Sequence, residues 1–521
     1  MRKMDRRGFL TIAGAAGVAA ATQSPLARAG RDLTRVTGYP FTLGVASGDP
    51  APDGAVLWTR LAPSPLSGGG MPQRRVTVDY EVALDERFRR TVRRGTTDAQ
   101  PQLGHSVHVE LAGLQPEREY FFRFRAAGEL SPVGRTITAP AAEATPDALA
   151  FAFVSCSQYE HGYFTAYGRL AEEDLDVVVH LGDYIYEYGP NVYDTPGGNV
   201  RAHSSREITT LEDYRNRHAQ YKTDPDLQTA HARFPWIVTW DDHEVDNNWA
   251  DEAPEDGQPP DAFLRRRAAA FQAYYEHMPL RRSSRPRGID LQLYRRIAYG
   301  DLATFNVLDT RQFRSDQACG DGRQRGCEER LDPARSITGD AQESWLLDGL
   351  EDSRTQWNVL AQQVFFAQRD YEAGPLQAFS MDAWDGYVAS RDRILGGIAE
   401  RRAANPVVLT GDVHQHWAAD LKADFDDPDS ETLGSELVCS SITSGGDGSA
   451  GSPPANRVVF AESPDVKYND NRRGYVRCQV DRKQWKADFR VVPYVKRPGA
   501  PVATDKSFVI EAGRPGLQPA P

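Results

Sequence analysis

Residues 177–186, VVVHLGDYIY, give the first indication of the fold. This apolar run predicts a buried strand that ends at Gly182-Asp183. Buried strands of this kind form the parallel sheets of α/β proteins, which bind ligands at the carboxyl edge of the sheet. Asp183 would carry a carboxylate to that edge, and Tyr186 follows three residues later. Because carboxylates bind Ca²⁺, Mg²⁺ or iron and a tyrosinate suits Fe³⁺, the stretch predicts metal chemistry.

Three more apolar runs, at 151–154, 236–239 and 406–410, end in residues that can bind metals. They lead into SCS at 155–157, WDDHE at 240–244 and GDVHQH at 411–416. An aspartate after a single strand is more often a helix cap or a turn residue than a ligand. Four such strand ends in one domain favour a shared metal site instead.

Beyond residue 146, apolar runs alternate with helical patterns such as 163–173 and 262–277. This alternation predicts a layered α/β domain. Three late runs, at 437–442, 473–480 and 485–493, predict antiparallel strands that complete a second sheet.

The first part of the chain has a different pattern. Between residues 39 and 138, short β-rich runs are separated by turn residues, which predicts a fibronectin-like all-β sandwich. Tyr120 ends an L-x-P-x-x-x-Y pattern that predicts a tyrosine corner, with its hydroxyl bonded to upstream backbone. Residues 138–146 have the composition of a linker. We therefore predict a sandwich domain over 30–140 and a catalytic domain over 141–521.

Residues 1–29 have the pattern of a twin-arginine signal peptide. Arg6 and Arg7 precede an Ala- and Gly-rich stretch, and Ala27-Arg28-Ala29 provides a cleavage pattern. A chance arginine pair in an ordinary signal or a short anchor is the alternative. The stretch is too short for a stable membrane span, which needs ~20 apolar residues. We expect export by the twin-arginine machinery to the cell envelope or the medium.

Composition narrows the class of protein further. Hydrophobic residues make up 40% of the 521-residue chain, which excludes a disordered protein. The net charge of −12 argues against a nucleic-acid-binding surface. In an oxidising compartment Cys319 could pair with Cys327 across a short loop, and Cys439 with Cys478. Cys156 is then left over, either as a functional thiol or as a small buried apolar residue.

Four histidines outside the main motifs receive their own predictions. His180 lies within the apolar run and is expected to be a core residue with a backbone partner. His416 would face the same side as His414, so it could belong to the site or to the core. His105 and His108 are expected at the surface of the sandwich.

Taken together, the motifs resemble those of the calcineurin-like metallophosphoesterases, and among them the PhoD-type alkaline phosphatases. The resemblance covers essentially the whole chain and is most specific at SCS 155–157, GDYIYE 182–187, WDDHEVDNN 240–248, DTRQFR 309–314 and GDVH 411–414. The generic metallophosphoesterase pattern has Asp, Asn and His where this chain has Cys156, Asp242 and Asp412. The thiolate of Cys156, with tyrosinate and imidazole, makes the first metal position suited to Fe³⁺. The carboxylates of Asp242 and Asp412 make the second position a harder, more anionic ligand set, which favours Ca²⁺ over Zn²⁺.

Carried over residue by residue, the resemblance implies two metal sites that share Asp183. The Fe³⁺ ligands would be Cys156, Asp183, Tyr186 and His414, and the Ca²⁺ ligands Asp183, Asp242 and Asp412. A further Ca²⁺ is implied, with Asn248 and Asp246 as the nearest candidate ligands.

Three residues are candidates for catalysis. His243 would face the substrate phosphate and stabilise charge or protonate the leaving oxygen. Arg311 could hold a phosphate or pair with a carboxylate, and Asn248 could take part beside the metals.

The predicted function is an exported metal-dependent alkaline phosphatase that hydrolyses phosphomonoesters and phosphodiesters with metal-activated water. A metal lowers the pKa of water from ~16 to about 7, so no phosphorylated serine is needed. The substrates would be small-molecule or lipid-derived phosphate esters. The alternatives are a phospholipase-D-like phosphodiesterase on the same scaffold, a hydrolase with Cys156 as nucleophile, and a non-enzymatic cell-surface binding module.

Overall fold

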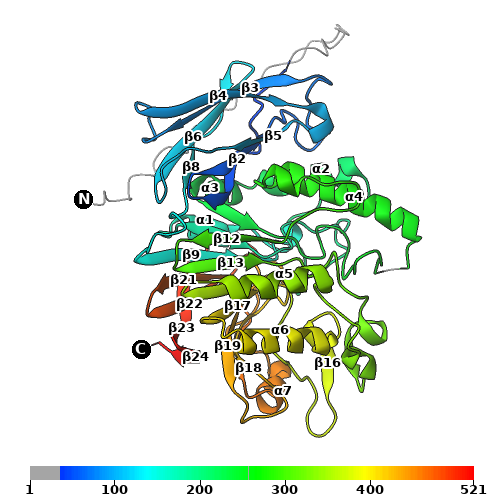
Figure 1. Ribbon diagram of the computed structural model, residues 1–521. Coiled ribbons are helices and arrows are strands. Elements are labelled where there is room, and N and C mark those ends of the chain that lie inside the picture. The colour runs from blue at the N-terminus through cyan, green and yellow to red at the C-terminus, as the bar shows by residue number, and fades with distance from the viewer. Residues whose placement is uncertain (1–35, 256, 521) are drawn as a thin grey trace.

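The fold is a layered α/β structure with an all-β region at one end (Figure 1). The computed structural model describes residues 36–255 and 257–520, so the predicted signal peptide at 1–29 lies outside the described residues. One hydrophobic core lies between the two large sheets and includes Phe151 and Val179 from one and Phe305 and Leu409 from the other. The helices are α1 (Thr165–Ala171), α2 (Leu211–Lys222), α3 (Pro225–Arg233), α4 (Pro260–His277), α5 (Gly339–Asp352), α6 (Val388–Glu400) and α7 (Arg457–Glu462).

The first sheet has ten strands, and its centre is parallel. In sheet order they are β24 (Arg514–Pro519), β23 (Ala503–Glu511), β22 (Gln484–Val492), β21 (Arg473–Asp481), β9 (Ala148–Val154), β10 (Val177–His180), β11 (Pro235–Val238), β1 (Val45–Ala51), β2 (Gly54–Arg60) and β5 (Ser106–Glu110). His180 pairs with Val154 of β9 and with Val238 of β11. The three strands therefore end level with one another, which brings the segments after them to one edge.

The second sheet has seven strands, four of them parallel. In sheet order they are β12 (Arg295–Tyr299), β13 (Ala303–Val307), β15 (Trp357–Ala361), β17 (Pro406–Thr410), β19 (Thr432–Val438), β18 (His416–Lys422) and β20 (Val466–Asp470). Beyond the end of β9, Ser155 forms a parallel bridge with Ser441, which follows β19. This bridge joins the two sheets where their carboxyl edges meet.

The prediction for the late strands was wrong in part. β19 does lie in the second sheet, but β21 and β22 extend the first, because β21 pairs antiparallel with β9. Apolar alternation predicts that a strand has one buried face, and it does not specify which neighbour the strand pairs with.

The N-terminal region forms the predicted sandwich, but one of its layers continues into the α/β core. Its outer sheet consists of β4 (Thr91–Ala99), β3 (Val76–Ala83), β6 (Glu119–Ala126), β7 (Glu129–Leu130) and β8 (Gly134–Ile137). β1, β2 and β5 form the inner layer and join the ten-stranded sheet through the parallel pairing of β1 with β11. The Gln115 N–H donates to the Tyr120 hydroxyl at 2.9 Å, which confirms the tyrosine corner. The domain boundary at 138–146 stays a prediction.

The histidine predictions had different outcomes. His180 is buried, with Nδ1 accepting from the Gly182 N–H at 3.2 Å, so the prediction of a core residue with a backbone partner is confirmed. The prediction that His105 and His108 lie at the surface was wrong, because both are buried. His108 stacks on Tyr275 of α4, which covers β5.

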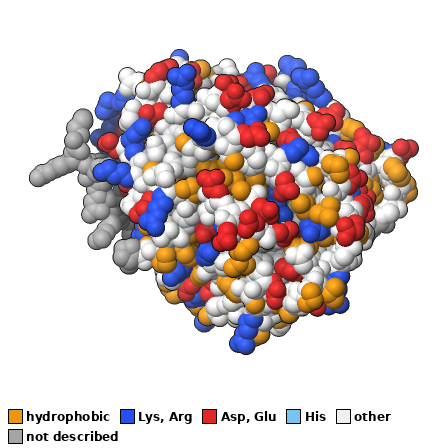
Figure 2. Space-filling view, turned by 60° about the horizontal axis from the view of Figure 1, so that its bottom comes forward, with side chains coloured by type: hydrophobic (Ala, Val, Ile, Leu, Met, Phe, Trp, Pro, Cys, Tyr) orange, Lys and Arg blue, Asp and Glu red, His pale blue; other side chains and the backbone are white. Residues whose placement is uncertain are grey.

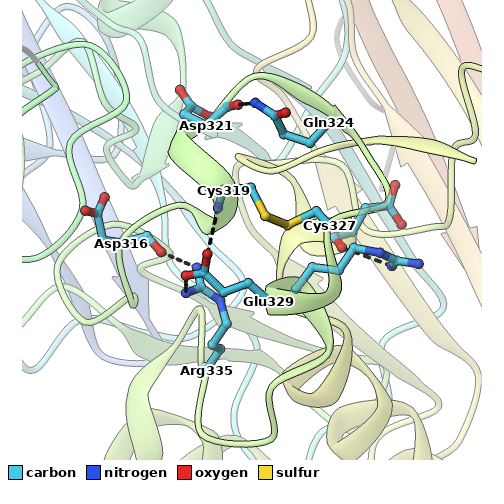
Figure 3. The surroundings of a disulfide bond; sticks show 9 residues. Asp316, Cys319, Asp321, Gln324, Cys327, Glu329 and Arg335 are labelled. Atoms are coloured by element: carbon cyan, nitrogen blue, oxygen red, sulfur yellow. Dashed lines mark hydrogen bonds and ion pairs between the residues drawn. A yellow bond between two sulfur atoms is a disulfide. The ribbon is translucent and has the colours of Figure 1, made fainter.

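One of the two cysteine pairings is present. Cys319 and Cys327 form a disulfide bond, with Asp321 in the loop that the bond closes (Figure 3). The pairing of Cys439 with Cys478 was wrong, since both are free thiols packed in the core between the two sheets as small apolar residues. Among the described residues, no helix is both long and apolar enough to cross a lipid bilayer.

Candidate metal centre

The segments after β9, β10, β11 and β17 place metal-binding side chains close together. Three sets have ligand atoms within 4.8 Å of one another, and they are Cys156, Asp183 and His414; Asp183, Asp242 and His243; and Asp241, Asp242 and Asp412. Asp183 and Asp242 each belong to two sets. The arrangement is therefore a chain of adjoining sites with shared carboxylates.

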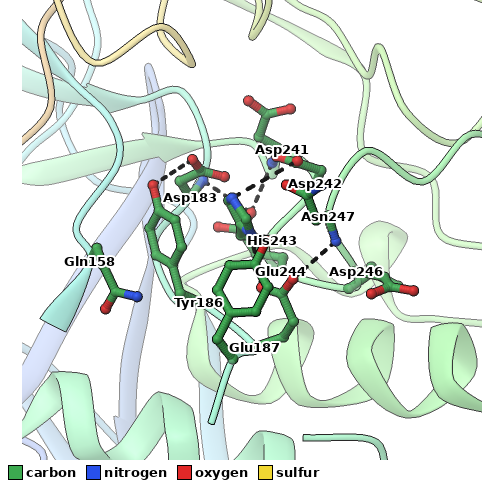
Figure 4. Close-up of polar contacts among 12 residues, drawn as sticks. Gln158, Asp183, Tyr186, Glu187, Asp241, Asp242, His243, Glu244, Asp246 and Asn247 are labelled. Atoms are coloured by element: carbon green, nitrogen blue, oxygen red, sulfur yellow. Dashed lines mark hydrogen bonds and ion pairs between the residues drawn. The ribbon is translucent and has the colours of Figure 1, made fainter. Parts of the chain in front are cut away.

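The first set contains three of the four residues predicted to bind iron, and Tyr186 lies beside it. The Tyr186 hydroxyl donates to Asp183 Oδ2 at 2.8 Å (Figure 4). It also lies 3.1 Å from His414 Nε2. Cys156 is fully buried, and burial together with the charge of Asp183 raises the pKa of its thiol. A thiol, a phenol, a carboxylate and an imidazole thus converge, which is the donor set that Fe³⁺ accepts.

The other two sets are dominated by carboxylates. Burial raises the pKa of Asp183 and of Asp412 well above the usual range, and the neighbouring aspartates add to the effect. Asp183 Oδ1 and Asp241 Oδ2 are buried and accept no hydrogen bond from the described residues. Buried anionic oxygens without donors are costly unless a cation neutralises them. The residues present therefore fit bound divalent or trivalent cations.

The turns that carry these ligands have unusual backbone conformations. Cys156, Asp183, Asp412 and His414 have φ values of 61°, 56°, 60° and 55°. This left-handed region is uncommon for residues other than glycine and is found most often where function requires it. β9, β10 and β17 therefore each end in a sharp turn that carries a ligand to the site.

Glu244 joins two of these turns. Its Oε2 accepts from the Asp183 N–H at 3.0 Å and the Asp241 N–H at 2.8 Å, and its Oε1 accepts from the Tyr184 N–H at 2.6 Å. A buried carboxylate with three backbone donors fixes the spacing of the two ligand-bearing segments. Sequence reasoning missed this role and that of Asp241, although both lie in the WDDHE motif that it singled out.

His243 lies against the carboxylates Asp183 and Asp242, with its ring stacked on Tyr186 at 4.1 Å. That it faces the substrate phosphate and not a metal stays a prediction. Its Nδ1 bonds to Glu187 Oε2 at 2.8 Å, and its Nε2 is 4.0 Å from Asp242 Oδ2. Burial opposes the positive charge, but Asp242, Glu187 and Asp183 outweigh it and raise the pKa of His243 well above its usual value. The ring can therefore offer an Nε2 proton at the edge of the site.

Arg311 pairs with carboxylates, which answers the question left open by the sequence. Its Nε donates to Asp241 Oδ1 at 2.6 Å, and its two terminal nitrogens donate to Asp382 at 2.7 and 2.9 Å. The guanidinium is completely buried. Arg311 thus orients the Asp241 carboxylate. Because these donors are already bonded to carboxylates, they are not free to hold a phosphate.

The remaining candidates divide into two groups. The Asn248 N–H donates to Asp242 Oδ2 at 2.8 Å, and its side-chain amide donates to Asp321 Oδ2 at 2.7 Å, so Asn248 lies beside the carboxylates. Asp246 is held away by an ion pair with Arg266 at 2.9 Å. His416 is buried, accepts from the Ser440 N–H and belongs to none of the three ligand sets.

The chain is similar to known proteins over nearly its whole length. The family model described as PhoD-like phosphatase matches residues 151–489, and the model described as the PhoD-like phosphatase N-terminal domain matches residues 27–140. The chain belongs to the PhoD-like phosphatase family. It is 56% identical over 480 residues to alkaline phosphatase D of Bacillus subtilis (strain 168), covering 92% of this chain and 82% of that protein. A solved structure described as "Structure of PhoD" has a TM-score of 0.92 and 55% identity, covering 94% of this chain and 93% of the other.

Membership of the PhoD-like phosphatase family confirms several predictions together. The α/β core behind an all-β N-terminal region, the resemblance to PhoD-type enzymes and the enzyme class of phosphoric ester hydrolase are all confirmed.

Gly182 offers a direct test of how this PhoD-like site is built. Its φ is +108°, and a Cβ there would lie 2.4 Å from Asp241 Cβ and 2.5 Å from the Asp241 nitrogen. We expect Gly182→Ala to destabilise the protein by about 3 kcal/mol and to lower its metal content, because Asp183 and Asp241 must both shift. Thermal unfolding and elemental analysis measure the two effects.

Gly198→Ala is the matched control for this variant. Gly198 also has a positive φ, +79°, but no atom lies within 4 Å of its added Cβ. The control should cost only about 1 kcal/mol and leave the metal content unchanged. Equal losses in both variants would show that backbone strain, and not the contact with Asp241, is responsible.

Proposed function

We propose that this PhoD-like phosphatase is an exported, metal-dependent enzyme that hydrolyses phosphomonoesters and phosphodiesters and releases phosphate. The observation that carries the proposal is the position of Asp183, which is shared by a sulfur-, phenol- and imidazole-containing ligand set and a carboxylate-rich one. Two unlike cations about one bridging carboxylate suit in-line displacement at phosphorus.

The residues present support Fe³⁺ in the first set and Ca²⁺ in the second. Cys156, Tyr186 and His414 would hold the iron, Asp242 and Asp412 the calcium, and Asp183 both. Asp241, with its unpartnered Oδ2, is a better candidate for a further Ca²⁺ than Asp246, and Asn248 remains beside it. When bound, such cations neutralise phosphate oxygens and lower the pKa of an attacking water.

The chain's own residues would orient the substrate and move the proton. His243 can donate its Nε2 proton to the leaving oxygen, because Glu187 holds the opposite ring nitrogen and fixes the ring. Glu244 holds Asp183 and Asp241 at a fixed separation, and Arg311 fixes the Asp241 carboxylate. Asn248 would complete the wall on the side of Asp321.

The charge and the N-terminal sequence bear on where the enzyme works. Acidic and basic side chains are interspersed over the face shown in Figure 2, and the net charge is −12. An anionic ester would thus be attracted by local cations and not by the overall field.

The twin-arginine pattern and the Cys319–Cys327 disulfide support export to an oxidising compartment.

The experiment that tests the function combines elemental analysis with substrate assays on the purified enzyme. Iron and calcium should be present, and chelation should abolish phosphate release from a monoester and a diester until both metals are restored. Alkylation should have little effect, since Cys156 is buried. Iron-free protein with full activity would contradict the proposal, and faster cleavage of phosphatidylcholine than of either ester would favour the phospholipase-like alternative.

Tyr186→Phe tests the assignment of the iron site. A tyrosinate bound to Fe³⁺ gives a visible charge-transfer band, and we expect the variant to lose this band and roughly 10- to 100-fold in activity or iron affinity. Tyr193→Phe is the control, because its ring lies 6.2 Å from that of Tyr186 and, among the described residues, its hydroxyl forms no hydrogen bond with a proposed iron ligand. A band that survives in Tyr186→Phe would exclude this tyrosine as a ligand. Visible absorption and iron analysis are the measurements.

A further inference from the structure

Ser444 lies in direct contact with the Tyr186 hydroxyl. It belongs to the segment after β19, is completely buried, and has its Oγ 2.7 Å from Tyr186 Oη. The same Oγ accepts from the Gln158 N–H at 3.1 Å and lies 2.9 Å from the Cys156 carbonyl oxygen. Ser444 therefore contacts the backbone of one predicted iron ligand and the side chain of another.

The hydroxyl of Ser444 has a single proton to give. The carbonyl of Cys156 is a neutral acceptor, whereas Tyr186 becomes an anionic acceptor when it binds a metal as a phenolate. Hydrogen bonds to ionised acceptors are roughly twice as strong as those between neutral groups. The proton of Ser444 will therefore point to Tyr186 in the metal-bound enzyme.

The segment that carries Ser444 is held in place on both sides. Arg473 Nη1 donates to the Ser444 carbonyl and to Ser441 Oγ, and the Ser441 hydroxyl also donates to the Ser444 carbonyl at 2.6 Å. The next residue, Gly445, donates its N–H to His161 Nδ1 at 3.0 Å. With its backbone fixed in this way, Ser444 keeps its hydroxyl at Tyr186.

We propose that Ser444 is a positioning residue that donates a hydrogen bond to the phenolate oxygen of Tyr186 and tunes the electronic properties of the iron. This inference depends on the proposed function, since it requires Fe³⁺ bound to Tyr186. The hydrogen bond stabilises negative charge on the phenolate, so less electron density is donated to the metal. Its removal should make Tyr186 a stronger donor to Fe³⁺.

The test compares the visible spectrum and the Fe³⁺/Fe²⁺ potential of wild-type and Ser444→Ala holoenzymes. A stronger phenolate donor moves the charge-transfer band to longer wavelength, and we expect a shift on the order of 20 nm, as for the loss of one charge-assisted hydrogen bond. The potential should move to a more negative value. Ser444→Thr keeps the hydroxyl and should have the band position and the potential of the wild type. If Ser444 had a purely structural role, neither the band nor the potential would move in Ser444→Ala.

Thr443→Val is the matched control, because Thr443 is equally buried in the same segment, but its hydroxyl donates to the Gln158 carbonyl at 2.7 Å instead of to Tyr186. Its band should stay in place. If Ser444→Ala fails to fold or to bind iron, Ser444→Cys, a weaker donor of similar size, should give a smaller shift in the same direction. A wild-type enzyme with iron and a charge-transfer band whose position is the same in the Ser444 variants would overturn this inference alone. A wild-type enzyme without iron would overturn the proposed function and this inference together.

Discussion

Replacement of Asp183 by asparagine is expected to reduce kcat/KM by at least about 10³-fold and to remove both metals. Asp183 is the residue shared by the two unlike ligand sets, and its Oδ1 is buried without a hydrogen bond from the described residues. Asparagine has nearly the same shape but lacks the charge that a bridging ligand supplies. Metal analysis and phosphate release measure the loss.

The stability of the metal-free protein separates this result from simple misfolding. In the absence of cations Asp183 is a buried carboxyl group next to Asp242, and burial raises its pKa well above the usual range. Because its negative charge is costly there, a neutral replacement should leave the metal-free protein as stable as wild type or more so. Asp213→Asn is the control, since Asp213 accepts hydrogen bonds from Thr210 at the start of α2, and the amide oxygen of asparagine can accept them too. A metal-free Asp183→Asn protein that unfolds far below wild type would show that the residue is needed for folding itself.

Replacement of Arg311 by methionine should have the largest effect on stability, about 3–5 kcal/mol. The guanidinium neutralises two buried carboxylates, bonding to Asp241 through one nitrogen and to Asp382 through two. Methionine fills part of the volume and leaves the Asp241 carboxylate without its guanidinium partner, whereas Asp382 keeps its ion pair with Arg314 at 2.8 Å. Denaturant unfolding of the metal-free protein measures the loss, and metal analysis should show weaker binding as Asp241 reorients.

Arg514→Met is the matched control for the Arg311 variant. Arg514 also pairs with a carboxylate, that of Glu511 at 3.2 Å, but the two side chains are 65% and 51% exposed. Exposed pairs contribute about 1 kcal/mol at most, so the control should unfold close to wild type. Similar losses in the two variants would contradict the special role that we assign to Arg311.

Much of the architecture followed from local patterns. The apolar runs before Cys156, Asp183, Asp242 and Asp412 became β9, β10, β11 and β17 almost residue for residue. β4 has no such local signal, because six of its nine residues are polar or charged and it lacks the apolar alternation on which strand prediction depends. The sheet to which β21 belongs and the pairing of Cys439 with Cys478 were mispredicted, because pairing between residues far apart in the chain has no local sequence signal.

The site likewise has parts that follow from local sequence and parts that depend on contacts between distant residues. Each predicted ligand directly follows a strand or its turn, so its position could be inferred from the chain itself. Ser444 and Asp382 act on residues 258 and 71 positions away, on Tyr186 and Arg311, and only the folded structure brings them together. The role of Glu244 could have been predicted from the sequence. It lies in the WDDHE motif beside candidate ligands, and a buried carboxylate there can accept hydrogen bonds from the backbone of the ligand-bearing segments.

The position of the site where the two sheets meet determines when it can form during folding. One sheet supplies Cys156, Asp183 and Asp242, and the other supplies Asp412 and His414. β9, which leads to Cys156, is completed only when β21 at Arg473–Asp481 adds beside it. Nearly the whole chain must therefore be synthesised and folded before an ion can bind with all its ligands. The choice of metal is then made in the compartment where the chain folds.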